Sequence, residues 1–143
     1  MLHCNLVAVE LLRQKSSIFA ADASSKNYGN FDTAQRAFNS VAVKERSKFE
    51  RENVMDKWGE YSNTVSGATT AVITLIIAID GDRTVLPNIN SISDLEKALT
   101  QIASDVTLNN VLRSAEILWT PQHENDVMSR RDIFMDYPQL HIL

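Results

Sequence analysis

The longest apolar run in the chain, residues 71–79, constrains the fold more than any other segment. Its high content of β-branched residues favours an extended strand over a helix. The run is also too short to cross a bilayer as a helix, which takes about 20 residues. We therefore predict a strand over residues 69–79 that is covered by other elements on at least one face.

Two weaker segments, residues 17–23 and 110–119, are predicted to be the other strands of one small sheet. A helix over residues 93–104 connects the last two strands, and Ser93 with Glu96 forms its expected capping box. If those strands are parallel neighbours, the crossover should be right-handed. The long loop before the helix, residues 80–92, also allows an antiparallel return.

The remaining apolar periodicity predicts further helices. Residues 2–13 carry one apolar stripe, and a helix is expected to start at Asp32, with Gln35 completing a capping pair. A second helical stretch runs from about residue 44 to residue 57. The residues expected to be buried together are Ile73, Leu75, Ile77, Leu99, Ile102, Ile117 and Trp119. The predicted fold class is α/β, with α+β possible, a small sheet of about three strands packed against helices within one domain, residues 1–143.

The C-terminal region holds two proline stops around a short helix. Pro121 ends the last long strand because proline lacks an N–H. Ser129 can cap the helix, and Pro138 ends it, since a residue before proline avoids helical angles. Phe134 and Tyr137 are expected to cover an edge or face of the sheet. The exposed side of this region is our candidate partner surface, formed by Gln122, Glu124, Asp126 and Arg130.

Charge narrows the class of partner. The formal net charge is -4 and the pI about 5.3, which argues against binding of a nucleic-acid backbone. Residues 44–52 are dense in charges of alternating sign. We expect a solvated helix there, with Arg46–Glu50 and Lys48–Glu52 ion pairs. Binding of an anionic lipid surface by residues 44–51 is a weaker alternative.

The residue types that often carry chemistry do not form a recognisable site. His3 and Cys4 are adjacent, so on a helix they point about 100° apart and cannot act as a base and nucleophile pair. A single cysteine also excludes an intramolecular disulfide. Together with His123 and His141, these two residues have no zinc-binding spacing, and we expect that they do not converge.

Two ligand-binding motifs are also absent. The segment that starts at Asp80 begins like a calcium loop, but Val85 and Ser91 stand where a glycine and a bidentate acid are required. None of the four glycines belongs to a nucleotide-binding motif. The sequence therefore predicts no catalytic residues, no cofactor and no metal.

Four blocks, in chain order, resemble a known family. They comprise residues 11–13; residues 38–39 with 45–49; residues 71–79 with 86–87, 89–90 and 94–95; and residues 116–122 with Asp126 and residues 136–138. The last block contains Leu118, Trp119, Thr120, Pro121 and Gln122, and is the most specific. Together they are similar to the uncharacterised domain family of cyanobacteria and chloroplasts that includes the fluctuating-light-acclimation protein of thylakoids.

The resemblance implies a biological setting without implying a reaction. It points to a chloroplast or cyanobacterial protein, thylakoid-associated or stromal, with a role in photosynthetic acclimation and no established catalytic residues. Members of the family usually carry a long upstream segment, so we expect this chain to correspond to their C-terminal domain, soluble and without a transmembrane segment. The leading hypothesis is a non-enzymatic regulatory or scaffolding domain that binds a protein partner. Enzymatic or small-molecule binding at a cryptic site, and peripheral lipid binding, are the alternatives.

Overall fold

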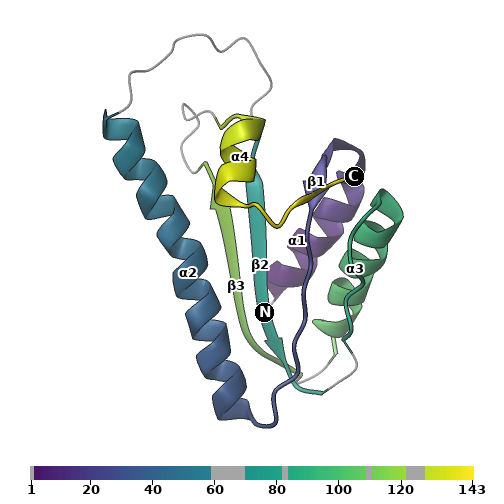
Figure 1. Cartoon of the computed structure of the whole chain (residues 1–143). Helices are drawn as coiled ribbons and strands as arrows, with labels where there is room; N and C mark the ends of the chain where they lie inside the picture. Colours follow the sequence, from purple (N-terminus) through teal and green to yellow (C-terminus); the bar gives the residue numbers. More distant parts are fainter. Residues whose placement is uncertain (1, 59–69, 82–83, 109–110, 122–127) are drawn as a thin grey trace.

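The computed structural model describes residues 2–58, 70–81, 84–108, 111–121 and 128–143 (Figure 1). Its elements are, in chain order, α1 (Leu2–Arg13), the 3-10 helix η1 (Lys15–Ser17), β1 (Ala20–Ala21), α2 (Phe31–Trp58), β2 (Val72–Ile79), α3 (Ile92–Asp105), β3 (Leu112–Thr120), α4 (Arg130–Asp136) and β4 (His141–Ile142). This mixture of helices and small antiparallel sheets agrees with the predicted α/β or α+β class. Helix α1 has the bounds that the apolar stripe predicted.

The strands form two separate two-stranded sheets, so the expectation of one three-stranded sheet is wrong. Strands β2 and β3 pair antiparallel, which settles the orientation that the sequence left open. Strand β1 is shorter than predicted and pairs instead with β4, at the C-terminal end of the chain. The chain brings β4 back beside β1, and this partner was not visible in the pattern of residues 17–23.

The two faces of the β2–β3 sheet have different surroundings. Helix α2 packs on one face, where Gln35 accepts a hydrogen bond from the Ser114 hydroxyl over 2.8 Å and Arg46 binds Glu116. Side chains alternate between the faces of a strand. Ile73 and Trp119, which are cross-strand partners, therefore point to the opposite face.

Two clusters of buried residues make up the described core. The first contains Ala8, Ile89, Leu95, Ala98 and Leu99, and lies around α1 and α3. The second contains Met128, Ile133 and Tyr137, with Phe19, Val72 and Leu140 packed against it. Figure 1 shows α1 and α3 to one side of the β2–β3 sheet, and α4 at the end of the sheet where β3 finishes.

The predicted core is only partly correct. Leu99 is buried, and Leu75, Ile77, Ile102 and Ile117 are half-buried. Ile73 and Trp119, however, are 45% and 52% exposed. They were assigned to the core because apolar strand residues are usually covered. At this end of the β2–β3 sheet, the face opposite α2 leaves their side chains open.

Helix α2 starts earlier and runs further than predicted. Asn30, and not Asp32, occupies the capping position, because the Thr33 N–H donates to Asn30 Oδ1 over 2.9 Å. The stretch over residues 44–57 continues this helix and is not a separate one. Asn and Asp are both favoured at the capping position of a helix, so the sequence alone did not show whether Asn30 or Asp32 caps α2.

Helix α3 is confirmed, but its cap is Ser91 in place of Ser93. The Asp94 N–H donates to Ser91 Oγ over 3.2 Å, and the Asp94 carboxylate accepts from the Asn90 N–H and the Ser91 hydroxyl. These hydrogen bonds, first that of Asn90 and then that of Ser91, lower the pKa of Asp94. The sequence offers two serines, each with an acidic residue three positions later, and the chain uses the first.

The two serines give a direct test of this cap. We expect Ser91→Ala to lower the free energy of unfolding by about 0.5–2 kcal/mol, because the Asp94 N–H loses its acceptor. Ser93→Ala is the matched control and should change it by less than about 0.5 kcal/mol, as at an ordinary exposed position. Urea unfolding of both variants measures the difference. A larger effect at Ser93 would contradict the assignment.

The C-terminal helix α4 is built as the sequence predicted. Ser129 caps it in a full capping box with Asp132: Ser129 Oγ accepts from the Asp132 N–H over 3.2 Å, and the Asp132 carboxylate accepts from the Ser129 N–H over 3.1 Å. Strand β3 ends at Thr120, directly before Pro121, and α4 ends at Asp136. Ile133 and Tyr137 are buried, so this segment closes one side of the fold.

Candidate functional site

Arg130 is the one member of the predicted partner surface that falls within the described residues. The other three, Gln122, Glu124 and Asp126, lie outside them. Arg130 is exposed at the start of α4, and its guanidinium carbon lies 4.3 Å from the centroid of the Phe19 ring. The Phe19 and Phe134 rings meet edge to face at 6.3 Å. Arg130 therefore combines an accessible charge with a cation–π contact that holds it in place.

A buried cation connects α2 to the C-terminal segment. Lys48 is buried, and its ammonium lies 4.2 Å from the centroid of the Tyr137 ring and 3.0 Å from the Glu45 carboxylate. The predicted partner of Lys48 was Glu52, whose side chain lies outside the described residues. A buried ammonium needs compensation of this kind, because its removal from water is costly. The charge-dense segment is therefore not wholly solvated, because the Lys48 side chain is buried.

Arg46 connects α2 to the sheet. Its Nε and Nη2 each lie 2.5 Å from an oxygen of Glu116 on β3, a two-point contact between guanidinium and carboxylate. Glu50, the predicted partner of Arg46, also lies outside the described side chains. The hydrogen bonds from Arg46, more than its charge alone, lower the pKa of Glu116. This pair fixes the position of α2 over the sheet.

The Arg46–Glu116 pair predicts a response to acid. Because the pKa of Glu116 is lower in the folded state than in the unfolded state, the pair contributes stability above the unfolded value and loses it as pH falls through the folded one. We expect the free energy of unfolding to fall below about pH 4.5, with a smaller fall in Glu116→Gln. Arg46→Gln should reduce the acid response to the same degree. Unfolding series across pH measure this, and an unchanged wild-type slope in both variants would contradict it.

The exposed pair of Ile73 and Trp119 was missed as a surface feature. We call it the hairpin pair because β2 and β3 are antiparallel neighbours, although α3 lies between them in the chain. The two residues face each other across β2 and β3, on the face opposite α2. Aromatic side chains with this exposure are enriched in protein–protein interfaces. The sequence prediction buried the two residues together, and no sequence signal showed that this face is open at their position.

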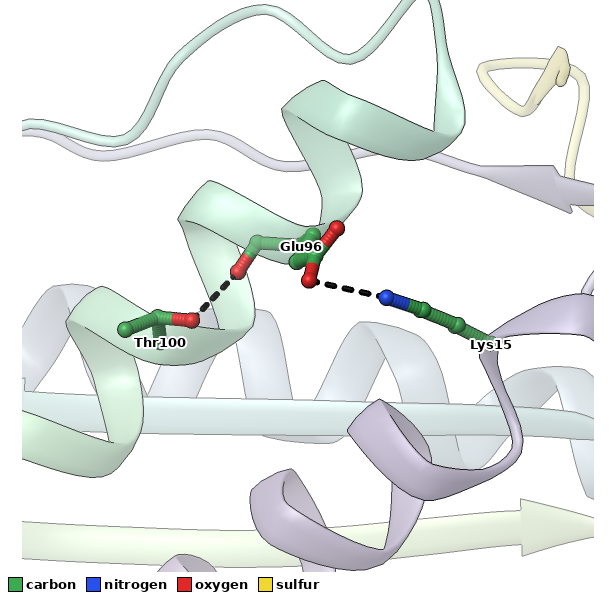
Figure 2. A network of polar contacts seen from close by, with 3 residues as sticks. All are labelled: Lys15, Glu96 and Thr100. Atoms are coloured by element: carbon green, nitrogen blue, oxygen red, sulfur yellow. Dashed lines mark hydrogen bonds and ion pairs between the residues drawn. The ribbon is translucent and has the colours of Figure 1, made fainter.

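A shallow hollow lies on α3, away from the hairpin pair. Its volume is about 400 Å³, and it is lined by Glu96, Lys97, Thr100, Gln101 and Ser104, all from this one helix. Figure 2 shows that Lys15 reaches across to Glu96 over 2.8 Å, while the Thr100 hydroxyl donates to the Glu96 carbonyl oxygen. Ligand pockets usually draw convergent groups from several elements. This hollow is therefore an open part of the α3 surface, beside the ion pair of Lys15 and Glu96.

Asp105 is a buried carboxylate at the end of α3. It accepts hydrogen bonds from Gln101 Nε2, at 2.9 and 3.0 Å, and from the Thr84 hydroxyl. These hydrogen bonds offset part of the cost of its burial, because a buried carboxylate without partners is strongly unfavourable. Asp105 therefore attaches the segment before α3 to the end of that helix.

The residues considered for chemistry are separated or withdrawn from solvent. Cys4 is buried on α1, and its burial raises the pKa of the thiol, which disfavours the nucleophilic thiolate. His3 and His141 are exposed, on α1 and β4, and His123 lies outside the described residues. Across the ranges that the structure describes, no three His, Cys, Asp or Glu side chains gather as metal ligands would.

None of the described helices has the combination of length and apolar character that a bilayer-spanning helix requires.

The comparisons with known proteins cover nearly the whole chain. The family described as "Protein of unknown function (DUF1517)" matches residues 2–143. The chain is 31% identical over 140 residues to FLUCTUATING-LIGHT-ACCLIMATION protein 1, chloroplastic, of Arabidopsis thaliana, which covers 93% of the chain and 35% of that protein. It is 29% identical over 136 residues to Protein FLAP1 homolog A of Synechocystis sp., covering 85% of the chain and 40% of that protein. The chain thus spans little more than a third of each relative. No solved structure matches it significantly.

Proposed function

We propose that this chain, which belongs to the DUF1517 family of proteins of unknown function, is a non-enzymatic regulatory or scaffolding domain in photosynthetic light acclimation. Its relatives in Arabidopsis thaliana and Synechocystis support the setting, since the plant protein is named for acclimation to fluctuating light and as chloroplastic. We place the chain in a chloroplast or cyanobacterial cell, where it binds a thylakoid-associated protein.

The hairpin pair is the observation that carries the binding role. Ile73 and Trp119 form a cross-strand pair, and about half of each side chain is open to solvent. Covering these side chains would stabilise a complex by about 25 cal/mol for each Å² of apolar surface removed from water. A protein partner supplies such cover, and a large exposed aromatic residue is typical of the residues that dominate binding energy.

The charged end of α4 is the second part of the proposed binding region. The Arg130 guanidinium is held over Phe19 in a defined position, where it can pair with a carboxylate of the partner. Gln122, Glu124 and Asp126 belong to the same surface in the sequence prediction and lie outside the described residues. Trp119 lies three residues before Gln122, so the chain itself connects the hairpin pair to this polar segment.

Capture of a partner tests the proposal. The purified chain is immobilised and exposed to a detergent extract of illuminated photosynthetic membranes, and bound proteins are quantified by mass spectrometry. We expect a specific thylakoid protein to be captured by the wild type and lost with Trp119→Ala. Val85→Ala removes another exposed apolar side chain, 73% open, that lies outside the β2–β3 ladder, and should leave capture unchanged.

Two further arms separate the alternatives. Saturable stabilisation by a metabolite, without capture of any protein, would favour a small-molecule site and overturn the proposal. Binding to anionic vesicles that is lost in Lys44→Gln would favour a lipid-surface module. Equal capture by the wild type, Trp119→Ala and Arg130→Ala would remove both parts of the proposed binding region.

A further inference from the structure

The two buried clusters have no residue in common. The first is formed by α1 and α3 with the segment before α3, and the second by α4 with its neighbours on β2 and before β1. Side chains that pack together usually form one contiguous core in a domain of this size. In the described part of the chain, no half-buried residue packed against the first cluster is also packed against the second.

The chain segments beside β1 and β4 contribute to both clusters. Ile18 packs on the first cluster, and its neighbour Phe19 packs on the second. Near the other end of the chain, Leu140 packs on the second cluster and Leu143 on the first. Figure 1 shows the last residues running from α4 towards α1 and α3. The β1–β4 ladder is therefore a seam between two separately packed parts.

The seam is small. It consists of two residue pairs, Ala20 with Ile142 and Ala21 with His141, and one further hydrogen bond of 3.0 Å from the Leu143 N–H to the Phe19 carbonyl oxygen. Both residues of β4 are exposed, with Ile142 72% open to solvent. A two-stranded pair of this length is marginal without packing, and Leu143 supplies that packing on the first cluster. Helix α1 also touches β3, so the seam is not the sole contact between the two parts.

We infer that the C-terminal segment, residues 137–143, is a latch, and that the folded chain opens along the β1–β4 seam without unfolding completely. In the open state α1 and α3 keep the first cluster between them, while they separate from the β2–β3 sheet. Local openings of this kind need less free energy than global unfolding when few apolar contacts are broken. A partner that binds the open state more tightly would shift the population towards it.

Native-state hydrogen exchange on the full chain tests the latch. We expect the amides of residues 20–21 and 141–143 to exchange at least about tenfold faster than those of α3 and of the β2–β3 ladder. Leu143→Ser should raise exchange at the seam by about another tenfold, because it removes apolar packing on the first cluster. The exchange of the central α3 amides should stay unchanged. Ile142→Ser is the matched control, since its side chain is already exposed, and it should exchange as the wild type does.

The latch is overturned if the seam, α3 and the β2–β3 ladder exchange together in one cooperative step. The wild-type measurements decide this even if Leu143→Ser does not fold.

Discussion

Tyr137→Ala should lower the free energy of unfolding by about 3–5 kcal/mol, the range found when a buried aromatic ring is removed from a core. Tyr137 is only 2% exposed and is the largest fully buried side chain in the structure. It fills the second cluster beside Met128 and Ile133, so its removal leaves a cavity there. The ring also lies 4.2 Å from the buried Lys48 ammonium, which would lose a favourable neighbour.

Urea unfolding followed by far-UV circular dichroism measures this loss. Tyr28→Ala is the matched control, because Tyr28 is 39% exposed and the Lys26 ammonium lies 5.4 Å from the centroid of its ring. We expect the control to change the free energy of unfolding by less than about 1 kcal/mol. If Tyr28→Ala destabilises the chain more than Tyr137→Ala does, the C-terminal segment is not part of the core.

Tyr137→Phe separates the ring from the hydroxyl. The phenylalanine keeps the aromatic volume and the face that Lys48 approaches, so most of the stability should remain. A loss as large as that of Tyr137→Ala would show that the hydroxyl, and not the packing of the ring, holds the C-terminal segment in place. The comparison matters for function, because the same segment begins the proposed latch.

Local signals explain what the sequence predicted well. The apolar stripe of α1 has its period within the helix itself, and Ser129 caps α4 through an N–H three residues away. Pro121 and Pro138 act on their immediate neighbours, which is why the ends of β3 and α4 were found. Such features need no knowledge of what packs against them.

The errors arose where distant parts of the chain decide the outcome. Strand β1 pairs with β4, from opposite ends of the chain, and two-residue strands carry no periodicity that could indicate a partner. The serines at positions 91 and 93 offer equivalent capping patterns, so the path of the backbone selects between them. Local propensity is a weak guide wherever tertiary packing can override it in this way.

The candidate site illustrates the same limit. The prediction that Ile73 and Trp119 are buried together put them on one face, and the structure agrees that they share a face. Whether a face is buried depends on which helices reach it, and that information lies in residues far along the chain. Trp119 was therefore assigned to the core, while the residues chosen for the partner surface were the polar ones that follow it.

Leu99→Ala should lower the free energy of unfolding by about 2–5 kcal/mol, because Leu99 is 5% exposed at the centre of the first cluster. Its neighbours Ala98 and Leu95 share the buried face of α3, and Ala8 of α1 packs against them. Leu108→Ala is the control, since Leu108 follows α3 and is 47% exposed, and it should cost less than about 0.5 kcal/mol. Chemical denaturation of both variants measures the difference. A loss below about 0.5 kcal/mol in Leu99→Ala would mean that the buried face of α3 is misassigned. A loss in the expected range would show that Leu99 is tightly packed between α1 and α3, which the latch requires if that part is to stay folded when the seam opens.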